Sequence, residues 1–196
     1  MGCSKCGESG HNTKTCTTSQ PSIVVLDVDD VTIKKMDVLV NIFEDVAASL
    51  KKGQVEGTYQ KAITCDLQEM GIRYTSEETV PITYKGINIA YERIDIALSG
   101  WLDIVIELKA VCAGIKADNI WQVLSYMRYK NYKYGVVVNF NQSPNKQLEW
   151  QWVILNDGIP YIYDRTDGSS VKITDFEYPL RARETSACKT DLDGPR

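Results

Sequence analysis

The chain has 196 residues, of which 43% are hydrophobic and 24% are charged, and its formal net charge is −4. This length fits one medium domain with appendages, and the apolar content is too high for a disordered chain. No apolar run approaches the ~18 residues that a membrane-spanning helix needs, so we expect no membrane partner. The net charge argues against a protein that coats nucleic acid through bulk electrostatics, but a carboxylate-rich enzyme remains compatible with it.

The start of the chain lacks the basic and apolar regions of a signal peptide. We therefore expect an intracellular, reducing compartment: the cytoplasm, the nucleus or, for a viral protein, the virion. In such a compartment Cys65 and Cys112, which lie in apolar-periodic segments, are expected to be buried thiols rather than halves of disulfides.

The first segment carries cysteine and histidine in a metal-ligand spacing. Residues 3–16 read CSKCGESGHNTKTC, which is the pattern C-x2-C-x4-H-x4-C. Zinc prefers four tetrahedral thiolate and imidazole ligands, and a loop this short needs a metal to fold. We therefore predict that residues 1–18 form a zinc knuckle with the ligands Cys3, Cys6, His11 and Cys16.

The knuckle resembles the CCHC knuckles of retroviral nucleocapsid proteins and of many proteins that bind RNA or single strands. This resemblance implies a nucleic-acid partner, with Lys5 and Lys14 as phosphate contacts. Ser4 and Asn12 stand near positions where such knuckles often carry an aromatic or bulky group. A structural or protein-binding knuckle is the alternative.

The rest of the chain alternates helical and strand signals. Residues 19–29 read as a linker and a first strand at 23–26. Apolar spacing predicts helices at 31–52, stopped by Gly53, at 55–70 and at 118–130. Alternating patterns predict further strands at 79–84, 87–91, 92–98, 101–111, 134–140, 149–155, 159–163 and 171–173.

This order predicts an α/β fold in which helices flank a mixed β-sheet. We place the main domain at 30–156 and treat 157–196 as a C-terminal extension with a loose tail. Four aromatic residues near the boundary alternate as strand residues do, and we expect them in the core and on the sheet: Trp150, Trp152, Tyr161 and Tyr163.

The predicted strand 101–111 has one apolar face, and its other face carries Glu107 and Lys109. If the preceding strand pairs with it, Asp95 and Glu107 can converge on a cation. Mg²⁺ prefers a few carboxylates together with water and substrate phosphate. A solvated ion pair on an exposed face is the simpler interpretation of an isolated E-x-K.

The wider context of these residues resembles the PD-(D/E)XK nuclease superfamily. Asp95 followed by Glu107-Leu108-Lys109 resembles its D…(D/E)-x-K signature, and residues 53–59, GQVEGTY, match the G-x-x-E-x-x-Y sequence of one family within it. Gln122 and Tyr126 resemble the Q-x-x-x-Y pair of RecB-like nucleases, and they share a helix face. The resemblance covers roughly residues 31–140, and it implies a restriction-endonuclease-like fold.

The resemblance also implies roles for these residues. Mg²⁺ or Mn²⁺ would be held by Asp95, Glu107, Glu56 and the Leu108 carbonyl. Lys109 would act at the attacking water. Gln122 would orient the substrate or Lys109, and Tyr126 would contact phosphate or support the site.

Each of these helix residues also has a plain structural interpretation. Glu56 could be a helix N-terminal acid that interacts with the helix dipole. Tyr59 is expected to be a core aromatic, and Gln122 and Tyr126 could belong to an ordinary polar helix face.

The predicted function is Mg²⁺-dependent hydrolysis of phosphodiester bonds, in DNA rather than RNA. Phosphate contacts are predicted for a basic set consisting of Lys116, Arg128 and Lys130. The alternative is a protein of the same fold that binds or packages nucleic acid without turnover. The sequence leaves the oligomeric state open, a homodimer included.

Overall fold

The computed structural model describes residues 23–173. The four predicted zinc ligands and the two lysines between them, Lys5 and Lys14, lie outside the described residues. Whether residues 1–18 bind zinc is therefore a prediction from the sequence.

An eight-stranded mixed sheet forms the centre of the molecule, in the order β1-β8-β7-β6-β5-β4-β3-β2. The β4–β5 pair is parallel, and the other neighbours are antiparallel. The strands are β1 (Ile23–Val25), β2 (Tyr74–Tyr84), β3 (Ile87–Leu98), β4 (Ile104–Lys109), β5 (Tyr134–Asn139), β6 (Glu149–Asn156), β7 (Ile159–Tyr163) and β8 (Ser169–Lys172).

Three helices complete the domain: α1 (Asp30–Ser49), α2 (Glu56–Glu69) and α3 (Ala117–Lys130). The start of α1 is capped by Asp29, whose carboxylate accepts a 2.9 Å hydrogen bond from the Thr32 amide. The end of α1 comes earlier than predicted, because Leu50 adopts an extended backbone. Gly53 instead provides a positive φ of 93° in the turn before α2.

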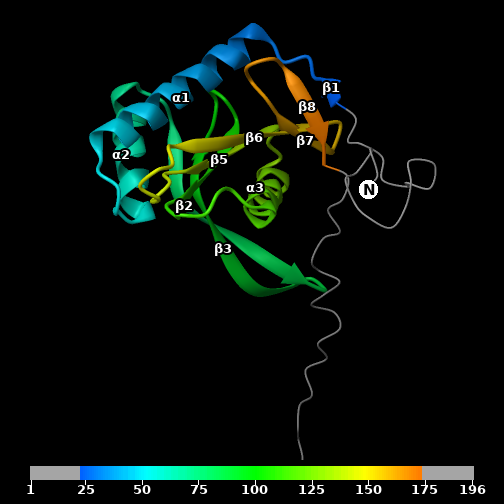
Figure 1. Cartoon of the computed structure of the whole chain (residues 1–196). Coiled ribbons are helices and arrows are strands. Elements are labelled where there is room, and N and C mark those ends of the chain that lie inside the picture. The colour runs from blue at the N-terminus through cyan, green and yellow to red at the C-terminus, as the bar shows by residue number, and fades with distance from the viewer. Residues whose placement is uncertain (1–22, 174–196) are drawn as a thin grey trace, which may run out of the picture.

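The helices cover the two faces of the sheet (Figure 1). α1 and α2 pack on one face, in a cluster that includes Phe43 and Ile63, whereas α3 packs on the other through residues such as Val123. Gly135 allows α3 to lie close to β5, since a Cβ atom there would come within 2.4 Å of the Val123 side chain. Among the helices of residues 23–173, none is long and apolar enough to span a bilayer.

The predicted α/β class and the hairpin around Lys85-Gly86 are confirmed. Three strand predictions differ clearly from the structure. The strand predicted at 79–84 begins at Tyr74, and 87–91 and 92–98 are one continuous strand, β3. The strand expected from 101 begins at Ile104. The predicted boundary at residue 156 falls at the turn between β6 and β7, and the sheet continues through β7, β8 and β1.

The aromatic residues of β6 and β7 are buried or partly buried, as predicted; Trp152 and Tyr163 are each 2% exposed. Cys65 and Cys112 are free thiols, as predicted, but the prediction that they are buried is wrong, because both are exposed. Cys65 lies on the outward side of α2, whose buried residues follow the spacing of Tyr59, Ile63 and Leu67.

Candidate active site

The candidate site lies where β3 separates from β4. The two strands pair only over Ile96–Leu98, although β3 starts at Ile87. At Asp95 a side-chain hydrogen bond takes the place of the backbone pairing with β4: Asp95 Oδ2 accepts a 2.8 Å hydrogen bond from the Leu108 amide. The remainder of β3 leaves the body as a projecting hairpin with β2 (Figure 1). We call the space between the diverging strands the fork.

The side-chain alternation of β3 also breaks at this point. Ile96 packs in the cluster beneath α1 and α2, but Ile94, two residues earlier, packs in the cluster beneath α3. On β2, Glu77 lies between the paired residues Ser76 and Glu78 and has a positive φ of 59°. The pairings of Ser76 with Ile96 and of Glu78 with Ile94 place Glu77 opposite Asp95 in the sheet.

Three acidic side chains converge electrostatically on the fork. Glu107 of β4 is 1% exposed, and Asp95 of β3 and Glu56 of α2 are partly buried. Burial and the charge of Asp95 raise the pKa of Glu107 from its usual 4.5 to about 8. Burial is also the main cause of the raised pKa values of Asp95 and Glu56. Carboxylates arranged in this way favour a bound cation.

Lys109 partly neutralises this charge. Its ammonium group donates to Glu107 Oε1 and, at 2.9 Å, to the Leu108 carbonyl. Burial opposes the charged form of Lys109, but the charges of Glu107, Glu56 and Asp95 raise its pKa above the usual value. The lysine is therefore a fixed ammonium beside the carboxylates rather than a neutral base.

Helix α2 contributes Glu56 to the fork and also forms a hydrogen bond with the backbone of Asp95. Glu56 is the first residue of the helix, and Gln60 lies one turn later on the same face. The Gln60 amide donates a 2.8 Å hydrogen bond to the Asp95 carbonyl. Gln60 was absent from the predicted site, although its spacing of four residues from Glu56 was a usable signal.

The G-x-x-E-x-x-Y segment is anchored to the loop after β5. Gln142 accepts a hydrogen bond from the Gly53 amide and donates one of 3.2 Å to the Tyr59 hydroxyl. Tyr59 is 2% exposed and stacks on Phe140 with ring centroids 4.2 Å apart, so the prediction of a core aromatic is confirmed. The first and last residues of the motif thus fix the position of Glu56 between them. No sequence signal pointed to Gln142.

The Q-x-x-x-Y pair of α3 forms its own hydrogen bond. Gln122 donates to the Tyr126 hydroxyl at 2.9 Å. Tyr126 is 1% exposed, and burial raises its pKa to about 12. The charges of Glu107 and Asp95 contribute to this rise, which places the phenol close to the fork. The buried phenol offers no open surface to phosphate.

The predicted basic set does not gather in one place. Lys116 precedes the first residue of α3, whereas Arg128 and Lys130 lie in its last turn, about 20 Å away for a helix of this length. Lys130 is also engaged, since it donates to both carboxylate oxygens of Glu78 at 2.8 Å.

The donor set of the fork fits a hard divalent cation. Glu107 Oε2 is buried and has no hydrogen-bond partner among the described residues, and an unpaired buried carboxylate oxygen is costly. Nevertheless, no three acidic, histidine or cysteine side chains of residues 23–173 form a ready-made metal group. Asp95 instead accepts a hydrogen bond from the Leu108 amide, and Glu107 accepts one from Lys109.

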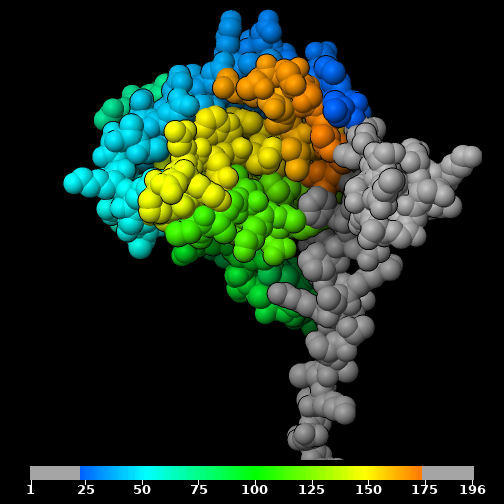
Figure 2. Space-filling view, viewed as in Figure 1, coloured from blue at the N-terminus to red at the C-terminus, as the bar shows by residue number. Residues whose placement is uncertain are grey.

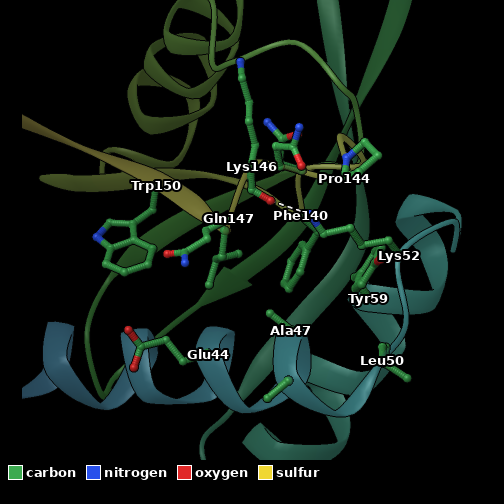
Figure 3. Close-up of a pocket in the computed structure, with 14 residues that line it drawn as sticks. Glu44, Ala47, Leu50, Lys52, Tyr59, Phe140, Pro144, Lys146, Gln147 and Trp150 are labelled. Carbon is green, nitrogen blue, oxygen red and sulfur yellow. Dashed lines mark hydrogen bonds between the residues drawn. The ribbon is translucent and has the colours of Figure 1, made fainter.

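A separate groove of about 630 Å³ lies between the end of α1 and the segment 140–150 (Figure 3). Its lining includes Glu44, Lys52 and Trp150, but none of the carboxylates of the fork. Lys52 donates to the Ser143 and Lys146 carbonyls, which ties the two sides together. The space-filling view shows the same segment, in yellow, against the cyan α1–α2 end (Figure 2). The groove's contacts are those of a structural junction.

The described site thus combines split strands, a buried acid pair and an adjacent lysine on a mixed sheet. The family model described as PD-(D/E)XK nuclease superfamily matches residues 34–151, more than half of the chain. The chain therefore belongs to the PD-(D/E)XK nuclease superfamily, whose members are usually nucleases dependent on Mg²⁺ or Mn²⁺. No curated protein and no solved structure gives a significant match.

Proposed function

We propose that this protein is a Mg²⁺- or Mn²⁺-dependent nuclease that hydrolyses phosphodiester bonds in DNA. The observation that carries the proposal is the buried Glu107 carboxylate, which has one unpartnered oxygen and lies beside Asp95 and Lys109. A structural ion pair would use both oxygens or lie in solvent. The superfamily membership supports the same chemistry.

Asp95 and Glu107 would hold the cation, with Glu56 and the Leu108 carbonyl completing the protein ligands. These are oxygen donors, which Mg²⁺ and Mn²⁺ prefer. When bound, the cation supplies Lewis-acid polarisation of the phosphodiester and activation of the attacking water.

The residues of the chain have their own tasks. Lys109 holds a positive charge where negative charge develops on the phosphate oxygens, which favours the transition state. Burial of Glu107 and Tyr126 excludes water from the inner side of the site, and this strengthens the electrostatic interactions there. Gln60 and Gln142 keep Asp95 and Glu56 in position.

The proposal has two further parts. The substrate is DNA rather than RNA, and a zinc knuckle adds affinity for single-stranded or structured nucleic acid. The knuckle is carried by the spacing of Cys3, Cys6, His11 and Cys16. Zinc analysis of the purified full chain tests it separately, and the expected result is one zinc per chain that is lost in a Cys6→Ser variant. A wild-type protein without zinc would contradict this part.

The test of function compares cleavage of single-stranded DNA, duplex DNA and RNA by the full chain with Mg²⁺, with Mn²⁺ and with neither. We expect metal-dependent cleavage of DNA that Asp95→Ala and Glu107→Ala abolish while circular dichroism shows an intact fold. An exposed acid far from the fork, changed as Glu44→Ala, is the matched control and should keep activity. Binding without cleavage would favour the inactive nucleic-acid-binding protein, and activity that survives both fork variants would overturn the proposal.

A further inference from the structure

An arginine stands at the open side of the fork. Arg93 lies on β3, two residues before Asp95, in the part of the strand that pairs with β2 but not with β4. Its side chain is 66% exposed and forms a 2.6 Å ion pair with Glu77. Glu77 is the residue with the positive φ that lies opposite Asp95. The carboxylate that holds Arg93 therefore comes from the strand position next to the fork.

The other cations considered for this side of the molecule are already engaged or distant. Lys109 is bonded to Glu107 and to the Leu108 carbonyl. Lys130 is bonded to Glu78, with 20% of its side chain exposed. Arg93, in contrast, has an exposed guanidinium two residues from Asp95, and its ion-pair partner Glu77 is exposed as well.

The ion pair of Arg93 is of a kind that exchanges easily. Both partners are exposed, Glu77 by 41%, and exposed ion pairs contribute little because water and salt screen them. A guanidinium forms stronger, bidentate hydrogen bonds with a phosphate, because two of its N–H groups match the spacing of two phosphate oxygens. A phosphate group that reaches Arg93 can thus replace the Glu77 carboxylate at small cost.

We propose that Arg93 binds a backbone phosphate of the nucleic acid adjacent to the cleaved bond, and that Glu77 occupies this binding position in the free protein. The inference rests on the proposed function, since it assumes that the substrate lies in the fork. It assigns this part of β3 to substrate positioning. Arg93 is a binding residue in this proposal, and Lys109 remains the residue that acts at the reacting phosphate.

Binding of a fluorescein-labelled DNA oligonucleotide to the full chain tests the proposal, by anisotropy over a series of NaCl concentrations with Ca²⁺ replacing Mg²⁺. Arg93→Ala should weaken binding about tenfold. It should also lower the slope of log K against log[salt] by about 0.7 to 0.9, as the loss of one phosphate contact requires. Arg93→Lys should retain the slope, and Glu77→Gln should tighten binding by about two- to fivefold, because it frees the guanidinium and removes a negative charge.

The matched control is Arg73→Ala. Arg73 is an exposed arginine that precedes Tyr74, the residue of β2 that pairs with Leu98, five residues along β3 from Arg93. It should leave affinity and slope unchanged. An Arg93→Ala slope equal to that of wild type would overturn the proposal, while cleavage by the wild type in Mg²⁺ would leave the nuclease function standing. If Arg93→Ala lowers the slope but the wild type does not cleave, the phosphate contact of Arg93 stands and the nuclease function is rejected. A wild type that neither binds nor cleaves would reject both.

Discussion

Replacing Glu107 by Gln should stabilise the metal-free protein at alkaline pH and remove its response to Mg²⁺. The unfolded side chain loses its proton near pH 4.5, but in the folded protein the pKa is about 8, because the carboxylate is buried beside Asp95. Its contribution to stability is therefore full below pH 4.5 and is lost as the pH rises through about 8. The whole difference corresponds to about 5 kcal/mol, at about 1.4 kcal/mol per pH unit.

The glutamine variant should recover only part of this free energy. Lys109 loses its charged partner in the variant, and leaving an ammonium half-buried is itself costly. We expect a gain of about 2 kcal/mol in the free energy of unfolding at pH 8.5. At pH 6, where folded wild type holds the proton, the two proteins should differ by less.

Urea unfolding followed by circular dichroism, at both pH values with and without Mg²⁺, measures this difference. Mg²⁺ should stabilise the wild type at pH 8.5, because it binds the folded carboxylates, and it should leave the Glu107→Gln variant unchanged. The exposed Glu44→Gln is the matched control and should behave like wild type within about 0.5 kcal/mol. A variant that is less stable than wild type at pH 8.5, and that Mg²⁺ still stabilises, would refute the reasoning.

Three further predictions concern metal binding, catalysis and packing. Mg²⁺ affinity, measured by isothermal titration calorimetry, should rise with pH up to about 8, since the cation must displace the proton from Glu107; an affinity that is constant from pH 6 to 8.5 would count against this site. Lys109→Met should keep Mg²⁺ binding but lower the rate of DNA cleavage by about 10² or more, and a gel assay that finds the wild-type rate would exclude its role at the phosphate. Gly135→Ala should destabilise the fold by about 2 kcal/mol or more, as seen in urea unfolding, because its Cβ would lie 2.4 Å from Val123 and 2.6 Å from Met127; unchanged stability would show that α3 can move away from β5.

Much of the fold followed from periodicity. The alternation in β4 predicted the burial of Ile104, Ile106 and Leu108 on one face and the placement of Glu107 on the other. The apolar spacing of the three helices gave their ranges within a few residues. The errors arose where tertiary contacts decide the outcome. β3 runs unbroken because β2 pairs with it along its whole length, and no local pattern contains that information.

The candidate site was harder to predict from the sequence than the fold. The motifs identified the candidate site residues directly, but the hydrogen bonds that hold these residues come from partners far along the chain. Gln142 joins Gly53 and Tyr59 over more than eighty positions, and Gln60 reaches Asp95 across 35. The phosphate contacts predicted for the basic set remain predictions, and the helix places Lys116 and Lys130 at its opposite ends.

The structure of β3 also explains why Asp95 and Glu107 form a site at all. Continuous pairing of β3 with β4 would place Asp95 directly against Glu107, with both acids inside a closed sheet. Because the pairing of β3 with β4 begins only at Ile96, the Asp95 carboxylate instead accepts a hydrogen bond from the Leu108 amide. Glu56 of α2 interacts electrostatically with Asp95 at this point. On the neighbouring strand, Glu77 has a left-handed backbone.

The most direct test of the central claim is single-turnover cleavage of labelled DNA by excess full-length protein as Mg²⁺ is titrated, for wild type and Asp95→Asn. The carboxamide keeps the size of the side chain and its acceptor for the Leu108 amide, and it removes the negative charge. We predict saturable Mg²⁺-dependent cleavage by the wild type and a rate lower by at least about 10³ for the variant. Equal rates for the two proteins, or cleavage by wild type that is independent of added divalent metal, would contradict a metal-dependent site in the fork.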